Sequence, residues 1–228
     1  INRINMKKTL IGLVISMFWF ASASADVGAR LGVTGNAALY AATATELDTG
    51  SHGTTTDFDE SQTQSEYLGL VYGSVFAEVG FGPVFVGVDY MPGSIDTEEA
   101  STTVGDKTTS DTSTDVTNKV SVEFENLTNF YAGVRILDSF FFKAGSLSVD
   151  LNTKESLGTG SSYGNTSVDG TMMAVGMDKV LDNGMFFRVE GQYSEFDSAS
   201  LTSSSGSQKI TMESLDGVVG KLSIGKAF

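Results

Sequence analysis

Residues 185–196 read MFFRVEGQYSEF, and a period of two runs through the whole stretch. Phe187 and Val189 alternate with the charged residues Arg188 and Glu190, which separates apolar from polar side chains. Successive side chains of a β-strand point to opposite faces, whereas those of a helix return to one face every 3.6 residues. The stretch is therefore predicted to be a strand with one apolar and one polar face.

The same alternation recurs along the chain and predicts eight strands. Their ranges are 26–40, 66–81, 84–91, 120–136, 140–151, 170–180, 185–196 and 210–228. The connections between them alternate in length, with short ones at 80–83, 137–139 and 181–184 and long polar ones at about 41–64, 92–118, 152–168 and 197–209. The last short connection contains Asn183-Gly184, which is typical of a tight hairpin turn.

An even number of strands, with short turns at one end and long loops at the other, is the pattern of a transmembrane β-barrel. A strand of about ten residues tilted by roughly 40° covers about 25 Å, the height of the apolar band of such a barrel. The predicted fold class is all-β, a closed antiparallel up-and-down transmembrane β-barrel of eight strands. A soluble secreted β-sandwich is the alternative, but the polar phase carries the small, aromatic and singly charged residues that a narrow barrel interior needs.

The polar phase of these strands is expected to face the barrel interior. Its charged members are Arg30, Glu78, Asp89, Glu123, Glu125, Arg135, Asp178, Arg188, Glu190 and Lys221. An interior of eight strands is filled by side chains, and an unpaired buried charge costs several kcal/mol, so these charges are predicted to form a structural ion-pair network. The alternative is a gated, narrow path for cations or water, controlled by Arg135, Arg188 and Glu190.

Strand 140–151 is ambiguous, because Phe140-Phe141-Phe142 and the later set Leu147, Val149 and Leu151 fall on different phases. A bulge in this strand would reconcile them. Lys143 cannot be assigned to a face for the same reason. In strand 120–136, by contrast, Phe124 and Phe130 share one phase and are both expected to face lipid.

The start of the chain resembles a secretion signal in its order of residue types. Lys7-Lys8, an apolar run at 10–20 and Ala23-Ser24-Ala25 follow Met6, which is the expected initiator. This order predicts a secretory signal peptide cleaved after Ala25. The alternative, a transmembrane helix, is disfavoured because the apolar run is too short to span a bilayer. The predicted organisation is 1–25, upstream residues plus signal peptide, and 26–228, the outer-membrane barrel domain.

Composition excludes several classes of protein. The 228 residues hold 14 Lys plus Arg against 28 Asp plus Glu, a formal net charge of −14, which argues against binding to a phosphate backbone. There is no cysteine, which excludes disulfides, thiolate catalysis and Cys-ligated metal centres. The single histidine, His52, excludes multi-His metal sites. With 40% hydrophobic residues and a mean hydropathy near zero, the chain is too apolar for disorder.

Much of the acidic excess lies in the first two long connections. Asp57, Asp59 and Glu60 offer hard oxygen ligands to Ca²⁺, but they lack the spacing and glycine of an EF-hand loop. An exposed acidic loop is the simpler interpretation, and no metal site is predicted. Divalent ions could instead bridge these carboxylates to lipopolysaccharide phosphates.

These residues resemble the small eight-stranded outer-membrane barrels, the OmpA/OmpX type and the related porin-family barrel domain. The resemblance covers 26–228. Local matches are Phe142-Lys143-Ala144-Gly145, Phe187-Arg188-Val189-Glu190, Gly191-Gln192-Tyr193 and a terminal Phe228 with Leu222 and Ile224 at alternate positions. The resemblance implies that Leu222, Ile224 and Phe228 are a signal to the barrel-insertion machinery, although Lys226 stands where an apolar residue is usual.

The expected protein is an integral outer-membrane protein of a Gram-negative bacterium, with periplasmic termini and acidic extracellular loops. Its expected role is structural or surface-interactive: membrane integrity, adhesion or receptor. Expected partners are outer-membrane lipid, lipopolysaccharide and the insertion machinery, with no nucleic acid and no cofactor, and the protein is expected to be a monomer. A narrow porin-like channel is the first alternative. A lipid-modifying enzyme is the second, but His52 lies between glycine-rich segments with no packed partner to orient a general base.

Overall fold

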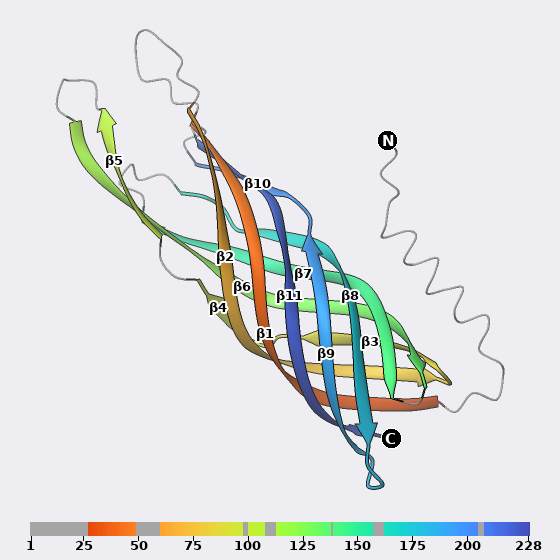
Figure 1. The fold of residues 1–228 in the computed structure, drawn as a ribbon. Helices are drawn as coiled ribbons and strands as arrows, with labels where there is room; N and C mark the ends of the chain where they lie inside the picture. The colour runs from red at the N-terminus through yellow and green to blue at the C-terminus, as the bar shows by residue number, and fades with distance from the viewer. Residues whose placement is uncertain are drawn as a thin grey trace, which may run out of the picture.

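The computed structural model describes residues 27–48, 60–97, 100–107, 113–137, 139–156, 162–204 and 208–228. The predicted signal peptide lies outside these residues. The strands are β1 (Val27–Asp48), β2 (Glu60–Phe81), β3 (Val84–Tyr90), β4 (Ser94–Asp96), β5 (Ala100–Lys107), β6 (Ser113–Ile136), β7 (Phe140–Ser156), β8 (Thr166–Val180), β9 (Met185–Phe196), β10 (Ala199–Thr202) and β11 (Gln208–Ala227) (Figure 1). Within the described ranges, no helix is long and apolar enough to cross a membrane.

Eight strands form a closed antiparallel ring. The order is β1-β2-β3-β6-β7-β8-β9-β11, and β11 pairs with β1 to close it. The short strands β4 and β5 pair with β6, and β10 pairs with β11. The predicted up-and-down barrel is confirmed, and the described strands form one closed sheet rather than the two layers of a sandwich.

The strands are staggered around the ring. We start at Leu31 on β1 and follow the paired residues from one strand to the next, through β2, β3, β6, β7, β8, β9 and β11. The path returns to β1 at Ala41 rather than at Leu31. This offset from residue 31 to residue 41 corresponds to a strand tilt of roughly 40°. We call the end that holds the connections at 82–83, 137–139 and 181–184 the turn end, and the opposite end the loop end.

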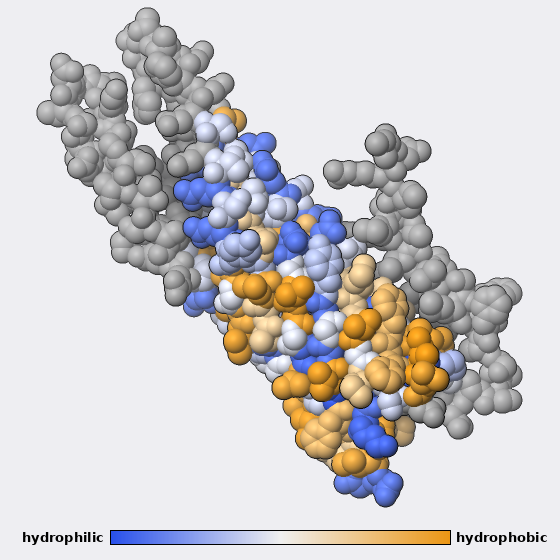
Figure 2. All heavy atoms as spheres, in the orientation of Figure 1, coloured by the Kyte–Doolittle hydropathy of each residue, from blue (hydrophilic) through white to orange (hydrophobic). Residues whose placement is uncertain are grey.

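The barrel is apolar outside and charged inside, the reverse of a soluble barrel. Outward side chains such as Leu31, Val175, Phe187 and Leu222 are 53–65% exposed. The apolar residues gather mainly over the part of the barrel nearer the turn end, and hydrophilic ones predominate toward the loop end (Figure 2). Only a hydrocarbon environment removes such a belt from water, and the backbone pairing around the closed ring suits that environment. The barrel therefore spans a membrane.

Several strands continue beyond their predicted limits at the loop end. Strand 66–81 begins at Glu60, strand 120–136 begins at Ser113, and the connection predicted at 92–118 contains β4 and β5. These extensions are rich in Ser, Thr and charged residues on both faces. Backbone pairing persists there although the sequence lacks the apolar–polar alternation that marks a strand.

The bulge predicted for strand 140–151 is wrong. β7 pairs with β8 in continuous register from Phe140 to Leu151. Its buried side chains are the alternate ones from Phe141 to Leu151, whereas Phe142 is outward and 42% exposed. The ambiguous phase arose because the interior of this strand is itself apolar toward the loop end.

The bulge lies instead in β6, where the pairing with β7 shifts between Glu125 and Thr128. Asn126 occupies the left-handed region there (φ 55°), which asparagine tolerates better than most residues. The extra residue reverses the two faces of β6 on its loop-end side. Phe124 therefore packs against the interior core rather than lipid, and Glu123 and Glu125 face outward.

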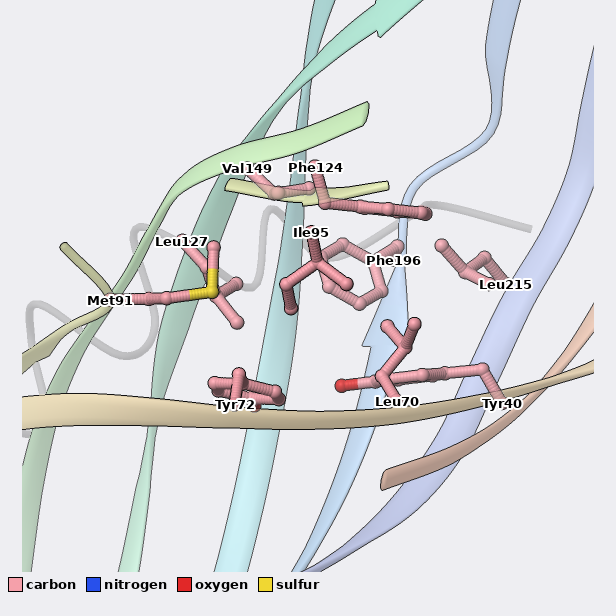
Figure 3. Close-up of a pocket in the computed structure, with 10 residues that line it drawn as sticks. All are labelled: Tyr40, Leu70, Tyr72, Met91, Ile95, Phe124, Leu127, Val149, Phe196 and Leu215. Atoms are coloured by element: carbon pink, nitrogen blue, oxygen red, sulfur yellow. The ribbon is translucent and has the colours of Figure 1, made fainter. Parts of the chain in front are cut away.

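The interior has two layers. Along β9 the inward side chains change from Arg188 and Glu190 near the turn end, through Ser194, to Phe196 near the loop end. The loop-end layer is apolar, and Tyr40, Phe196 and Leu215 are among the residues that line a small cavity in it (Figure 3). The turn-end layer is charged.

Candidate functional site

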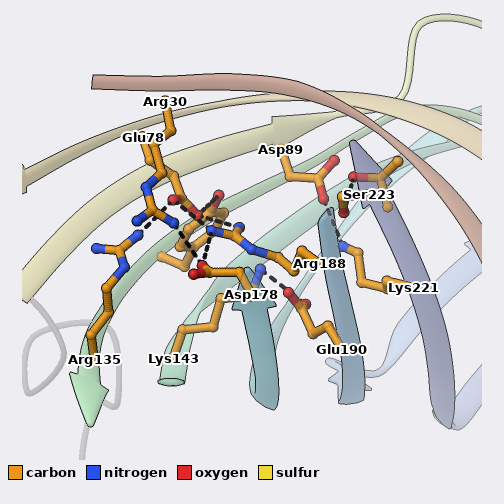
Figure 4. Close-up of polar contacts among 12 residues, drawn as sticks. Arg30, Glu78, Asp89, Arg135, Lys143, Asp178, Arg188, Glu190, Lys221 and Ser223 are labelled. Carbon is orange, nitrogen blue, oxygen red and sulfur yellow. Dashed lines mark hydrogen bonds and ion pairs between the residues drawn. The ribbon is translucent and has the colours of Figure 1, made fainter. Parts of the chain in front are cut away.

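The charged layer receives side chains from every strand of the ring (Figure 4). They are Arg30 (β1), Glu78 (β2), Asp89 (β3), Arg135 (β6), Lys143 (β7), Asp178 (β8), Arg188 and Glu190 (β9) and Lys221 (β11). Each occupies an inward position of its strand, and apart from Lys179 beside Asp178 their outward neighbours carry no charge, so the alternation of the sequence places them there.

The centre of this layer is the pair Arg188–Glu78. Arg188 Nη1 lies 2.6 Å from Glu78 Oε1, and Nη2 lies 2.9 Å from Oε2, a two-pronged guanidinium–carboxylate contact. Both side chains are almost fully buried. Tyr131 donates a hydrogen bond to Glu78 Oε1 at 3.1 Å, and Arg135 Nη2 donates one to Oε2 at 3.1 Å. One carboxylate thus joins two other strands, β6 and β9, to β2.

Asp178 extends this centre toward β1. Its Oδ2 accepts hydrogen bonds from Arg188 Nη2 at 3.2 Å and from Arg30 Nη1 at 2.7 Å. Arg188 therefore bridges two carboxylates, and each of these also holds a second arginine. Such a network contributes cohesion because every charge in it has a partner, whereas an unpaired buried charge would be costly.

Two further ion pairs lie beside the centre. Lys143 Nζ is 2.9 Å from Glu190, and Lys221 Nζ is 2.6 Å from Asp89. Lys221 also donates to Gln192 Oε1 at 3.3 Å. All four charged side chains are buried.

Aromatic rings fill the space between the charges. The Arg188 guanidinium lies over the rings of Phe76, Phe141 and Phe186 at 4.8–5.4 Å, and that of Arg135 lies over Phe85 at 4.2 Å. These contacts combine cation–π attraction with close packing. They leave the guanidinium groups little rotational freedom and fill the lumen at this level.

Among the charges listed above there is one more cation than anions. Arg30 and Arg135 share their carboxylates with Arg188, and their side chains are 18% and 15% exposed. The positive excess therefore lies where the layer meets the turn end of the barrel. A carboxylate or phosphate entering from that side would meet two arginines rather than an acidic group.

The predicted interior set divides in two. Arg30, Glu78, Asp89, Arg135, Asp178, Arg188, Glu190 and Lys221 lie together in the lumen, with Lys143 among them. The placement of Glu123 and Glu125 inside is wrong, because the β6 bulge turns both outward. Glu123 pairs instead with Lys154 on the surface at 3.1 Å, and Lys154 also contacts Asp96 at 2.7 Å. A hydrogen bond from Ser94 and the Lys154 ammonium lower the pKa of Glu123.

Other predicted site residues are more scattered. Leu222 and Phe228 lie outward and are 65% and 72% exposed, with Ile224 between them on the same face. His52, Asp57 and Asp59 lie outside the described residues, and Glu60 is the first residue of β2. The described residues contain no group of three or more potential metal-ligating side chains.

Two contributors to the lumen were not predicted. Tyr131, whose hydroxyl donates to Glu78, is not among the predicted site residues, and no apolar loop-end layer is predicted. The signal for that layer was present, since Leu147, Val149 and Leu151 stand at odd positions in phase with Lys143. Because Lys143 is polar and the other three are apolar, the sequence alone does not show that all four face the interior.

The outer surface carries a pH-sensitive contact above the apolar belt. Asp150 of β7 accepts hydrogen bonds from Ser167 at 2.5 Å and from Asn126 in the bulge at 3.0 Å. These bonds favour the carboxylate and hold the pKa of Asp150 below its ordinary value of 3.8. Its contribution to stability is therefore present at neutral pH and is lost as the pH falls below 3.8 through the lowered pKa.

Replacement of Ser167 by alanine is accordingly expected to lower the urea midpoint of unfolding at pH 7, because the carboxylate loses its strongest donor. The difference from the wild type should shrink as the pH falls below 3.8 and through the lowered pKa of the wild-type Asp150, since below that pKa the carboxyl is protonated in both proteins. Urea unfolding in lipid vesicles across this range measures it. A difference that stays constant with pH would show that the hydroxyl acts through packing alone.

Comparison with known proteins gives a likeness of fold. No protein-family model matches the sequence, and no curated protein sequence matches it. Similar solved structures include Ail, the attachment invasion locus protein of Yersinia pestis, at 10% identity and TM-score 0.38, covering 86% of this chain and 99% of Ail. OprG of Pseudomonas aeruginosa is similar at 13% identity and TM-score 0.39, covering 85% of this chain and 96% of OprG. The barrel architecture itself is established by the strand pairing.

Proposed function

We propose that this protein is an integral outer-membrane barrel of a Gram-negative bacterium, closed to solutes along its axis and acting at the cell surface. The observation that carries the proposal is the ion-paired layer in the lumen, to which all eight strands contribute, with the Lys221–Gln192 hydrogen bond joining the Lys221–Asp89 pair to β9. The apolar layer above it is a second obstacle to ions, since ions do not cross an apolar layer without a hydrated path.

The surface role is supported by what projects from the loop end. The paired ends of β1 and β2, and the pair formed by β5 with β6, extend beyond the apolar belt (Figure 1). Residues 41–64 and 92–118, which we call the acidic rim, carry much of the acidic excess of the sequence. An acidic rim attracts basic partners through long-range electrostatics that salt screens. We therefore expect adhesion or receptor contacts with positively charged groups, weakening as ionic strength rises.

The proposed lipid, lipopolysaccharide and insertion-machinery partners follow from the same position in the outer membrane. The apolar belt contacts outer-membrane lipid, and the acidic rim lies beside lipopolysaccharide phosphates, with divalent ions as the natural bridge between like charges. Leu222, Ile224 and Phe228 are offered to the insertion machinery from the outward face of β11. Nothing in this proposal requires an enzymatic step.

A narrow polar path is the second candidate function. The observation that favours it is a polar zone between the two layers, where Asn36 Oδ1 and Asn129 Oδ1 are buried and have no hydrogen-bond partner within the protein. Such groups are suited to binding water. This path would carry protons or water slowly and would still have to cross the apolar layer.

Planar-bilayer recording of the refolded barrel distinguishes these functions. We expect no steady conductance at neutral pH and no steps of the size given by an open porin measured in the same membranes. Small steps that disappear when Asn36 and Asn129 are replaced by leucine would support the narrow path. Conductance steps as large as those of the porin would overturn the closed barrel.

A further inference from the structure

The barrel wall divides on one side near the loop end. β2 pairs with β3 only from Val75 to Phe81, the last pair being Val75 with Tyr90. Beyond it, β4 lies against β6 rather than β2. Within the described residues, no strand pairs with this edge of β2 from Glu60 to Ser74. We call this unpaired boundary between β2 and β4 the seam.

The sequence explains where the seam starts. After Tyr90, the segment Met91-Pro92-Gly93 interrupts the strand before β4 begins. Pro92 has no backbone N–H to offer a neighbouring strand, and Gly93 has a φ of 131°. The Met91 N–H donates to Leu127 O of β6 at 2.9 Å, which holds this segment on the β6 side. The chain therefore leaves β2 at this point.

The outward side chains of β2 beside the seam include large apolar ones that suit contact with lipid. Val71 and Tyr67, on the outward face of β2 beside the seam, are 83% and 81% exposed. On the other neighbour of β2, Leu39 is also outward and apolar at the level of Gly69. The apolar belt thus continues past the start of the seam at Val75.

Behind the seam lies the apolar cavity of the loop-end layer (Figure 3). Leu70 and Tyr72 line it from β2, Met91 and Ile95 from the β3–β4 segment, and Phe196 and Leu215 from the opposite wall. No charged side chain lines this cavity. On the turn-end side, the ion-paired layer closes the lumen. The cavity therefore lies between the ion-paired layer and the unpaired edge of β2, where the outward side chains Val71 and Tyr67 are apolar and exposed.

We propose that a hydrocarbon chain of a membrane lipid enters through the seam and occupies this cavity. An unbranched chain suits the site because the lining supplies apolar contact and no charge to recognise a polar group. The cavity is small, so an entering chain must displace side chains. Met91 is suited to this because its thioether side chain is unbranched and adapts to irregular spaces.

A single tryptophan placed in the cavity tests this. In a Trp19→Phe background, which removes the only native tryptophan, Phe124→Trp reports on the cavity. Phe130→Trp on the same strand reports on lipid, and Phe141→Trp reports on the interior behind an unbroken wall. Each protein is refolded into vesicles of phosphatidylcholine with brominated acyl chains, and the loss of tryptophan emission relative to unbrominated vesicles is measured.

We expect the emission of Phe124→Trp to fall nearly as much as that of Phe130→Trp, and far more than that of Phe141→Trp. The indole of Phe141→Trp is also separated from lipid by the thickness of the barrel wall. Its quenching therefore measures how much bromine atoms in the lipid quench across an intact wall. Quenching of Phe124→Trp no greater than that of Phe141→Trp would overturn the proposal. So would stronger quenching by aqueous iodide than by bromolipid, because the cavity would then open to water.

Leu215→Trp, on the opposite wall of the cavity, is the second reporter if Phe124→Trp does not fold. Heat-modifiable mobility on gels checks folding of every variant before the measurement. The result is independent of the proposed axial closure, because a barrel that excludes lipid from the cavity can still be closed to ions.

Discussion

Replacing Glu78 with alanine is expected to lower the free energy of unfolding by about 3–5 kcal/mol, the range for breaking a buried ion pair by removing one partner. The carboxylate accepts bonds from Arg188, Arg135 and Tyr131. Without it, Arg188 retains only Asp178 within ion-pair distance, and Arg135 loses its described ion-pair partner. Guanidinium groups do not deprotonate, so the strain cannot be relieved by loss of the charge.

The measurement is urea-induced unfolding in lipid vesicles, analysed by linear extrapolation. Glu123→Ala is the matched control, because the alternation of the sequence assigns both glutamates to the interior while the structure places only Glu78 there. Glu123 is paired on the surface, so its replacement should leave the midpoint nearly unchanged. Equal losses for the two variants would mean that the charged layer does not stabilise the barrel.

The barrel and most of its charged layer were predictable because both depend on one local rule. A strand with lipid on one side and a packed lumen on the other must alternate, and Arg188, Glu190 and Lys221 are inward for that reason alone. Which charges pair is not local. Glu78 and Arg188 are far apart in sequence, and they meet only because the stagger of the ring brings β2 and β9 to one level.

The wrong placement of Phe124, Glu123 and Glu125 comes from a single residue of register. A bulge adds one residue to β6, and every side chain on its loop-end side changes face, which moves Phe124 inside and Glu123 outside. The apolar Phe130 and Phe124 stand an even number of residues apart, so the sequence continues in phase across the bulge. Only the partner strand β7 indicates this change of face, because Leu151, which pairs with Phe124, is apolar and buried in the interior.

The two layers of the lumen have different consequences for the barrel wall. The charged layer requires a complete ring, since each of the eight strands contributes a partner to it. The apolar layer requires no particular partner, and it tolerates the break at Met91-Pro92-Gly93 where β3 ends. A wall that is closed at one level and divided at the next is thus consistent with the chemistry of its own interior.

Gly145→Ala is expected to be strongly destabilising although it adds only a single methyl group. Gly145 lies inward on β7 opposite Tyr131, and a Cβ added to it would stand 2.1 Å from Phe130 O and 2.8 Å from Tyr131 Cα. Both are backbone atoms of β6, so no side-chain rotation relieves the contact. Overpacking of this kind typically costs roughly 1–3 kcal/mol, and we expect the upper part of that range because the ladder between β6 and β7 must move.

Gly191→Ala separates this contact from the general effect of removing a glycine from a strand. Gly191 faces outward on β9, and an added Cβ would meet nothing within 4 Å. Alanine restricts the unfolded chain more than glycine does, so Gly191→Ala should be neutral or more stable by about 0.5 kcal/mol. In Gly145→Ala, the urea midpoint of unfolding and the yield of heat-modifiable refolded protein should both fall. In Gly191→Ala, both should rise slightly or stay unchanged. Equal stability of both would mean that β6 and β7 have room to separate at Tyr131, and that the charged layer does not require their close approach.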